Sequence, residues 1–298
     1  ELAHAAPDEV RAVLEKVQHF APVGVAARDA RECLLVQIRN LHYDRDPILV
    51  ELVTSHLEDL EAKRYKPLLR KFKLDMEGLR EYLDIIQSLD PLPGASFGGA
   101  RSFCAMKHVG LNVAADPLFT VAYTGVNAGM VIAVADDPGM HSSQNEQDNR
   151  HYARAAKLAM VEPSDSQECL DFMREAYRIS EQFDIPVLFR TTTRVAHSKS
   201  IVTFGEREEQ EAKPYARNTR KNIASPANAF LNHPKLEKTL EALEAYGCTS
   251  PLNRMELNGT KVGVISASIA YEYAKDAFPA DTSFLKIGLT NPLPVDLI

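Results

Sequence analysis

The residues best suited to chemistry gather in one polar segment, DDPGMHSSQNEQDNRHYA, at residues 136–153. Its carboxylates, amides, hydroxyls and imidazoles can donate and accept every common type of hydrogen bond. A segment with so little to bury must be exposed, and an exposed loop either carries a function or only connects two elements. The candidate site residues in this segment are His141, Ser142, Ser143, Gln144, Asn145, Gln147 and Asp148.

A second candidate is the segment MKHVGLNVAADP, at residues 106–117. Here Lys107, His108 and Asn112 interrupt an apolar stretch around Gly110. A single histidine in such a place is more often a hydrogen-bonded structural residue than a catalyst. The residues alone therefore leave both interpretations open.

Two short apolar runs must position these polar residues. They are MVIAVA at residues 130–135 and IPVLF at residues 185–189, and each ends in a polar segment. Such runs predict buried parallel strands in a layered α/β domain. Ligands of these sheets bind beyond the carboxyl ends of the strands, which places residues 136–150 and 190–197 on the functional rim.

Further along the chain, KVGVI at residues 261–265 predicts another strand, and the run up to Ala277 predicts the helix that follows it. The small-residue turn between them lacks the glycine pattern of a phosphate loop, so we interpret it as a tight turn. We expect one α/β lobe at residues 97–205, a polar linker region at residues 206–258 and part of a second lobe at residues 259–298.

The first part of the chain has helical rather than strand periodicity. Asp46-Pro47 is an N-cap followed by a proline in the first helical position. Pro91 and Pro93 should end the last helix, because proline lacks the amide donor that a helix interior needs. We therefore predict an all-helical domain over residues 1–96, and a multi-domain chain overall.

A basic cluster without any acidic residue lies between two of the predicted helices. Such a cluster is often only a solvated face. The functional alternative is a contact for an acidic partner or a phosphate backbone. We find no helix-turn-helix with a recognition helix, so we expect no sequence-specific DNA binding. The cluster consists of Lys63, Arg64, Lys66, Arg70, Lys71 and Lys73.

Composition limits the classes of function. The chain has 298 residues, a formal net charge of −7 and a pI near 5.8, which argues against a general nucleic-acid binder. Its four cysteines are far apart, so we expect reduced cytoplasmic thiols, with no disulfide, metal site or iron–sulfur cluster. No apolar run approaches the roughly 20 residues that cross a bilayer. The first residue, Glu1, suggests that the sequence begins at a cut.

Three stretches carry a family resemblance: HFAPVGVAARDARECLLVQI at residues 19–38, HLEDLEAKRYKPLLRKFKL at 56–74 and IQSLDPLPGASFG at 86–98. Residues 1–98 resemble the core-binding region of sigma-54, the bacterial transcription factor whose promoters need activator ATPases. The resemblance implies docking onto the RNA polymerase core enzyme, and we assign this contact to the basic cluster. The promoter-reading parts of the family are not in this sequence, so promoter recognition is not implied.

The later stretches GARSFCAMKHVGLNVAADPLFT (residues 99–120), VEPSDSQE (161–168) and PVLFRTTTRVAHS (186–198) carry a second resemblance, together with the polar segment. From about residue 95 to the end, the chain resembles the α subunit of indolepyruvate ferredoxin oxidoreductase, a thiamine-diphosphate-dependent 2-oxoacid oxidoreductase. This implies that the first α/β lobe is the pyrimidine-facing domain of a thiamine enzyme. The second lobe would then resemble the C-terminal domain of transketolases.

The same resemblance implies that both candidate segments line a cleft for the cofactor or the substrate. The implied cofactor is thiamine diphosphate with Mg²⁺, and the implied partners are a β subunit and ferredoxin. The family's activating glutamate, its diphosphate-binding domain and its iron–sulfur cysteines are absent from this sequence. We therefore expect no turnover by this chain alone.

The tripeptide Gly94-Ala95-Ser96 fits both families where the two resemblances meet. We interpret the chain as a chimera joined at this short identity, and a genuine fusion with cooperating domains is the alternative. The α/β part then lacks its first strand and helix, so we expect an unpaired sheet edge. Two functions follow as hypotheses: an oxidoreductase α-subunit fragment, or a polymerase-docking module without promoter recognition.

Overall fold

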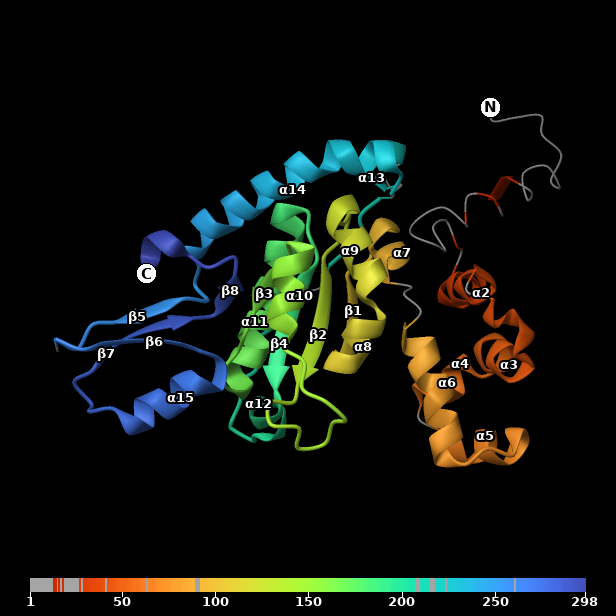
Figure 1. The fold of residues 1–298 in the computed structure, drawn as a ribbon, viewed down its shortest axis with the longest axis horizontal. Helices are drawn as coiled ribbons and strands as arrows, with labels where there is room; N and C mark the ends of the chain where they lie inside the picture. The colour runs from red at the N-terminus through yellow and green to blue at the C-terminus, as the bar shows by residue number, and fades with distance from the viewer. Residues whose placement is uncertain are drawn as a thin grey trace.

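The computed structural model describes most of the chain in two parts, a helical part and an α/β part (Figure 1). All statements below concern the residues that it describes: 13–14, 16, 18, 27, 29–40, 42–62, 64–88, 92–206, 210–214, 218–222, 224–259 and 261–298.

Up to residue 88 the described residues form helices and no strands, which confirms the predicted helical character. The predicted cap at Asp46 is also confirmed, because its carboxylate accepts from the backbone N–H groups of Ile48 and Leu49 at 2.9 and 3.2 Å. The helices are α2 (Ala30–Asn40), η1 (Tyr43–Arg45), α3 (Pro47–Ser55), α4 (Leu57–Glu61), α5 (Tyr65–Phe72) and α6 (Met76–Ser88).

Leucines hold these short helices together. Leu52, Leu60, Leu68 and Leu79 are buried in one cluster that joins α3, α4, α5 and α6. The hydroxyl of Tyr82 on α6 donates to the second carboxylate oxygen of Asp46 at 3.0 Å, so the α3 cap also ties two helices together. Burial of apolar side chains is therefore the main stabilising term in this part.

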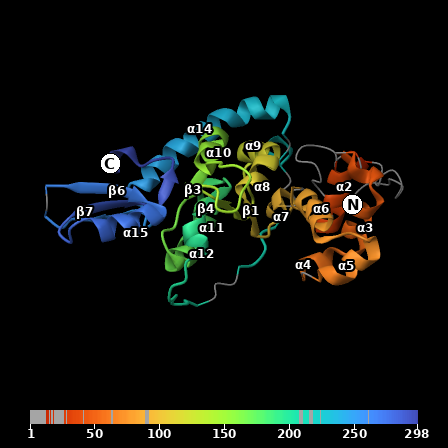
Figure 2. The ribbon, with the colours of Figure 1, turned by 60° about the horizontal axis from the view of Figure 1, so that its bottom comes forward.

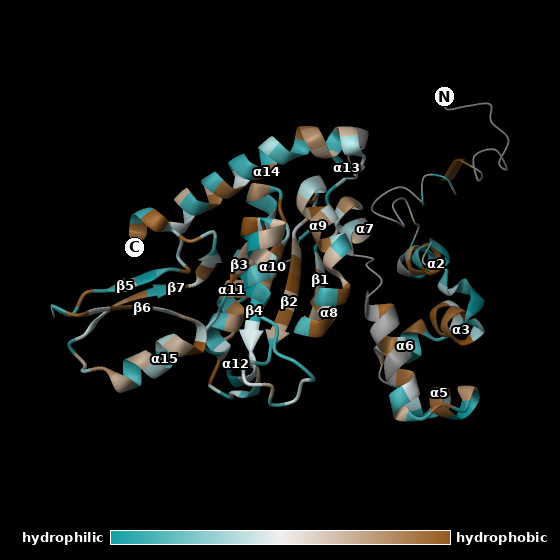
Figure 3. Ribbon diagram, viewed as in Figure 1, coloured by the Kyte–Doolittle hydropathy of each residue, from teal (hydrophilic) through white to brown (hydrophobic). Residues whose placement is uncertain are grey.

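The α/β part is built around a five-stranded sheet in the order β1-β2-β4-β3-β8. Its interior strands are nearly continuous apolar runs, which is typical of strands buried on both faces; β2 is brown along most of its length in Figure 3. The two predicted strands are confirmed as β2 and β4. The strands are β1 (Ser102–Lys107), β2 (Met130–Asp136), β3 (Ala159–Val161), β4 (Val187–Thr192) and β8 (Leu289–Asn291).

The helices that follow the strands in the sequence pack against the sheet. α8 contacts β1 and β2, α11 contacts β2 and β4, and α10 contacts β3. The core between them is apolar, with residues such as Val134, Met160 and Ile179 buried. These helices are α8 (His108–Val113), α9 (Ala115–Thr124), α10 (Asn149–Ala156), α11 (Ser166–Phe183) and α12 (Thr193–His197).

The stretch at residues 206–258, which we expected to be a linker region, contains α13 (Thr219–Asn222) and α14 (Pro226–Gly247). The side chain of Ser225 caps α14 by accepting from the Asn228 N–H at 3.2 Å. α14 packs against α9 and α11 through the buried Leu236 and Leu243. A few buried apolar residues in this polar stretch are enough to pack the long helix against the α/β part.

A second sheet of three strands, in the order β5-β7-β6, forms a smaller lobe (Figure 2). The predicted strands β2 and β4 do pair in parallel, but both sheets are mixed, because β5 is antiparallel to β7 and β8 is antiparallel to β3. Gly288 alone separates β7 from β8, so one extended segment passes from the second sheet into the first. The lobe consists of β5 (Arg254–Glu256), β6 (Gly263–Ala267), α15 (Ser268–Ala277) and β7 (Ser283–Ile287). η2 (Val295–Leu297) follows β8.

The tripeptide Gly94-Ala95-Ser96, where the two resemblances meet, lies in a helix that packs against the α/β part. The short helix α7 (Leu92–Phe97) contacts β1 and β2, and the Ser96 hydroxyl donates to the Ala128 carbonyl at 2.6 Å. The boundary that we expected after residue 96 falls inside α7, and this helix packs on the sheet of the α/β part. β1 lies at an edge of the five-stranded sheet. No helix in the described residues is long and apolar enough to cross a membrane.

Gly99, just after α7, has a backbone φ of +97°. A Cβ atom there would lie 1.7 Å from the carbonyl oxygen of Lys213, whose N–H donates to the Gly99 carbonyl at 2.8 Å. This close approach holds Lys213 against the turn that follows α7. Glycine is therefore required at this position for both conformation and space.

We predict that Gly99→Ala lowers the free energy of unfolding of the α/β part by about 2–4 kcal/mol, because strain and a backbone clash combine. Gly259→Ala is the matched control: Gly259 also has a positive φ of +83°, but a Cβ there meets nothing within 4 Å. The control should cost only about 1 kcal/mol. Urea titrations followed by circular dichroism measure both. Equal losses would contradict the proposed clash.

Candidate functional site

An open cleft of about 840 Å³ lies at the carboxyl ends of β1, β2 and β4. This is the edge where ligands of parallel sheets bind. One wall comes from the sheet and its loops, and Ile269 and Tyr273 of α15 contribute from the second lobe. The polar residues that line it include Lys107, Asp137, His141, Ser142, Arg194 and His197.

Asp137 folds the polar segment back over the sheet. Its carboxylate accepts from the backbone N–H groups of His141 and Ser142 at 3.1 and 2.8 Å. It also accepts from the hydroxyls of Ser143 and Thr193 at 2.6 and 2.7 Å. These hydroxyl bonds, with Ser143 first, hold the pKa of Asp137 well below its usual range. The loop is thus pinned by a carboxylate that stays ionised.

Lys107 comes from the end of β1 and reaches the same loop. Its ammonium donates to the Ser142 carbonyl, which leaves two of its three N–H donors for other partners. The structure therefore brings together three of the residues that the sequence analysis singled out, Lys107, His141 and Ser142, on the wall of one cleft.

Other residues of the first candidate segment have local roles. Asp148 caps α10 by accepting from the Arg150 N–H at 3.0 Å. Gln147 donates to the Asn145 side chain at 2.9 Å, and the Gln144 side chain is exposed. These residues shape the loop but do not line the cleft.

The second candidate segment divides in the same way. His108 begins α8, is fully buried, and neither ring nitrogen has a hydrogen-bond partner. Asn112 accepts from the Tyr152 hydroxyl at 2.6 Å and so ties α8 to α10. Gly110 lies within α8, where a Cβ would be 3.0 Å from Met106 Cβ. Only Lys107 of this segment lines the cleft.

A buried charge cluster, which was not among the candidate residues, borders the cleft through Asp136. The guanidinium of Arg190 contacts Asp136 at 2.6 Å and also bonds Glu162. All three side chains are buried, and Asp136 also accepts from the Asn149 N–H at 3.0 Å. Burial opposes the charge of Arg190, but the carboxylates of Glu162 and Asp136 outweigh it and raise the pKa of the guanidinium.

The sequence contained a feature that could have identified this cluster, namely charged residues in or next to the apolar strands. Arg190 belongs to β4, Asp136 ends β2, and Glu162 directly follows β3. Strand register puts the three at neighbouring positions, because Asp136 pairs with Thr192 and Val161 with Phe189. A charged residue at the end of each buried strand is the feature that could have identified them.

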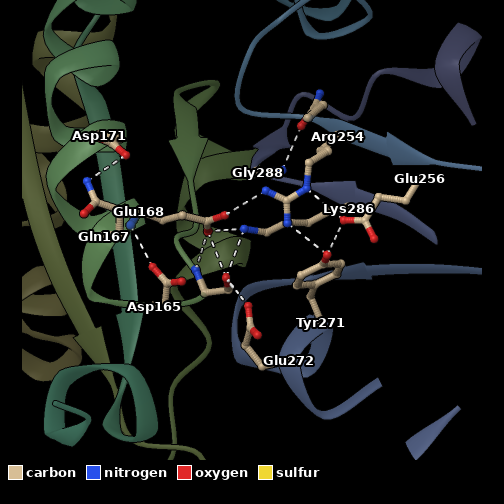
Figure 4. A network of polar contacts seen from close by, with 12 residues as sticks. Asp165, Gln167, Glu168, Asp171, Arg254, Glu256, Tyr271, Glu272, Lys286 and Gly288 are labelled. Carbon is tan, nitrogen blue, oxygen red and sulfur yellow. Dashed lines mark hydrogen bonds and ion pairs between the residues drawn. The ribbon is translucent and has the colours of Figure 1, made fainter. Parts of the chain in front are cut away.

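A second polar network holds the smaller lobe against α11 (Figure 4). Lys286 of β7 is only 1% exposed and bonds both Glu168 and Ser164, the latter at 3.0 Å. The Ser164 hydroxyl also donates to Glu272 of α15 at 2.8 Å. This network fixes the position of α15, which supplies the far wall of the cleft.

The basic cluster of the helical part is divided by its contacts. Arg64 pairs with Asp59 at 2.8 Å, and Lys71 pairs with Glu51 at 2.5 Å. Lys63 lies outside the described residues. The remaining three cations, on α5 and its C-cap, are exposed and form no ion pair with another described residue. They are Lys66, Arg70 and Lys73.

Comparisons with known proteins match the two parts of the chain separately. Residues 1–107 match the family model for the sigma-54 factor, core binding domain. Residues 88–246 match that for the pyruvate flavodoxin/ferredoxin oxidoreductase, thiamine diphosphate-binding part. The two predicted resemblances are therefore confirmed, each on its own segment, as expected for a chimera.

Individual relatives agree with this division. Indolepyruvate oxidoreductase subunit IorA of Methanothermobacter marburgensis is 45% identical over 217 residues, which are 71% of this chain and 35% of that protein. RNA polymerase sigma-54 factor of Salmonella typhimurium is 45% identical over 93 residues, 30% of this chain and 19% of that protein. The chain thus spans about a third of the IorA relative and about a fifth of the sigma-54 relative.

A solved structure supports the fold of the α/β part. The 2-oxoglutarate:ferredoxin oxidoreductase from Magnetococcus marinus, with 2-oxoglutarate, coenzyme A and succinyl-CoA bound, superposes with a TM-score of 0.52. The sequence identity is 15%, and the match covers 69% of this chain and 44% of that chain. At this identity the likeness concerns the fold alone.

We predict that Arg190→Met lowers the free energy of unfolding by about 3–5 kcal/mol, because it leaves buried carboxylates without a cation. Arg150→Met is the control: that side chain is largely exposed and its pairing with Asp148 should contribute at most about 1 kcal/mol. Urea titration measures both variants. A loss for Arg190→Met as small as the control's would show that the cluster is not a structural constraint.

Proposed function

The chain belongs to the family of the thiamine-diphosphate-binding part of pyruvate flavodoxin/ferredoxin oxidoreductases, and on that premise we propose that its α/β part is a fragment of an indolepyruvate-type 2-oxoacid oxidoreductase α subunit. In this proposal the five-stranded sheet corresponds to the pyrimidine-facing domain. The smaller lobe is the beginning of a domain like the C-terminal domain of transketolases. The helical part, which ends before Leu92, is a sigma-54 core-binding domain.

The pinned loop over the cleft is the observation that carries this proposal. Four hydrogen bonds to Asp137 fix the loop, and the Lys107 ammonium joins it at Ser142. A preorganised polar loop at the carboxyl edge of a parallel sheet is suited to holding a ligand in one orientation. This loop lies within the segment that matches the thiamine-diphosphate-binding family.

The side chains of the cleft fit only part of the implied cofactor. Lys107 and Arg194 offer cationic donors for a substrate carboxylate, and His141 and His197 can bond a heterocycle. The carboxylates of Asp136 and Asp137 are already engaged by internal bonds, so they do not fit Mg²⁺. Among the described residues no group of three or more His, Cys, Asp or Glu could hold a metal ion. We therefore propose that the fragment alone does not turn over substrate.

Hydrogen exchange of the full chain tests the cleft. Thiamine diphosphate or indolepyruvate should slow exchange at residues 137–143. Lys107→Met should weaken that effect about tenfold, since it removes a charged donor. Lys238→Met, an exposed lysine of α14, is the control and should bind like the native chain. Equal protection from exchange in the native chain and in Lys107→Met would contradict a ligand site at Lys107. Steady acyl-CoA formation by the chain alone would contradict the proposal that the fragment does not turn over substrate.

Docking onto the RNA polymerase core is the second candidate function. It is favoured by Lys66, Arg70 and Lys73, which are exposed and form no ion pair with another described residue, together with the match of residues 1–107 to the sigma-54 core-binding domain. Arg64 and Lys71 form ion pairs within the helical part, with Asp59 and Glu51. Among the described cations of the cluster, Lys66, Arg70 and Lys73 are then available to an acidic surface of the polymerase.

We predict that reversing Lys66, Arg70 and Lys73 to glutamate weakens binding of purified core polymerase at least about tenfold and reduces its salt dependence. The matched control reverses three exposed cations of the α/β part, Arg154, Lys235 and Lys238, and should bind normally. Pull-down over a range of salt concentrations measures both. Equal binding by the two triple variants would remove the α5 surface from the interface.

A further inference from the structure

β6 is an unusual edge strand because nothing in it discourages pairing with another chain. Edge strands are commonly protected by charges, prolines or short length. Among the strands at the described sheet edges, β1 ends in Lys107, β5 carries Arg254 and Glu256, and the short β8 runs into Pro292. β6 has the sequence GVISA and carries none of these devices.

One face of the same small sheet is apolar and uncovered. α15 covers the other face, where the rings of Phe284 and Tyr271 meet edge to face with their centroids 6.1 Å apart. Strand register aligns Met255, Leu285 and Ile265 in one row across the three strands of the open face. At the two ends of this row Met255 is 50% and Ile265 53% exposed, although both are large apolar side chains, while Leu285 between them is 8% exposed.

The charges around β6 allow it to pair with itself. Residues 262–271, VGVISASIAY, contain no charged side chain. If two copies of β6 run antiparallel with Ile265 opposite Ile265, Gly263 lies opposite Ala267. Lys261 then lies opposite Ile269, so no like charges face each other. A Cβ at Gly263 would meet nothing within 4 Å, so the start of the strand is open to a neighbour.

We propose that the chain forms a two-fold dimer in which β6 pairs antiparallel with β6 of a second copy about an axis at Ile265. The contact joins two three-stranded sheets into one of six strands. Directly opposed residues of an antiparallel pair point to the same face, so the apolar rows of both copies become continuous. Such an interface is self-complementary, as a two-fold dimer requires. The inference does not depend on the proposed function.

Sedimentation velocity of the full chain tests the dimer. The native chain should sediment as a dimer, and Ile265→Lys should raise the dissociation constant at least about a hundredfold, because it places two charges together in an apolar contact. Phe230→Lys, at an exposed apolar residue of α14, is the control and should remain dimeric. A monomeric native chain, or equal effects of the two variants, would overturn the proposal.

Cysteine crosslinking tests the register. Cα atoms of opposed residues in an antiparallel pair lie about 4.5–5.5 Å apart, within the range that a disulfide bridges. Ile265→Cys should therefore form an intermolecular disulfide under mild oxidation. Met255→Cys should not, because four strands separate the two copies of that residue in the six-stranded sheet. A dimer that crosslinks through Met255→Cys, or in which Ile265→Cys stays reduced, would overturn this geometry.

Discussion

The structure of the α/β part depends on the burial of one ammonium group, that of Lys286. A buried charge is tolerated only when it is paired and hydrogen-bonded, so β7 must place this lysine against Glu168 and Ser164. Burial lowers the pKa of Lys286, and the Glu168 carboxylate opposes that effect. The lysine also lies 5.1 Å from the centre of the Phe172 ring. One side chain thus fixes the second lobe on α11.

Arg190 satisfies the same requirement within the five-stranded sheet. Its guanidinium connects the ends of β2 and β4 to the residue after β3. The two buried cations therefore bracket the cleft: Arg190 orders the strand ends beneath it, and Lys286 orders the lobe that carries Tyr273. The charges of the two carboxylates that line the cleft are met by Arg190 for Asp136 and by hydrogen bonds for Asp137, which leaves Lys107 and Arg194 as cationic donors for a ligand.

The sequence predicted the elements whose pattern is local. The runs that became β2 and β4 are continuously apolar, and the cap at Asp46 needs only neighbouring residues. β1 was missed because an edge strand mixes exposed Phe103 with buried Ser102. α5 was missed because its lysines and arginines mask its few inward leucines. The expectation that ligands bind beyond the carboxyl ends of parallel strands located the cleft. The partners of Asp137 and Arg190 depend on strand register and loop closure, which no local pattern encodes.

Gly288 lets one extended segment serve both sheets, since a Cβ there would lie 2.3 Å from the Leu252 carbonyl oxygen. In mechanical terms, β8 is a latch. Tension on the C-terminus passes through η2, which contacts α14, and then reaches this three-residue strand. Release of β8 from β3 would transmit the load through Gly288 directly to β7 and Lys286. The smaller lobe should therefore detach in a single event under force, while β1, β2, β4 and β3 stay paired.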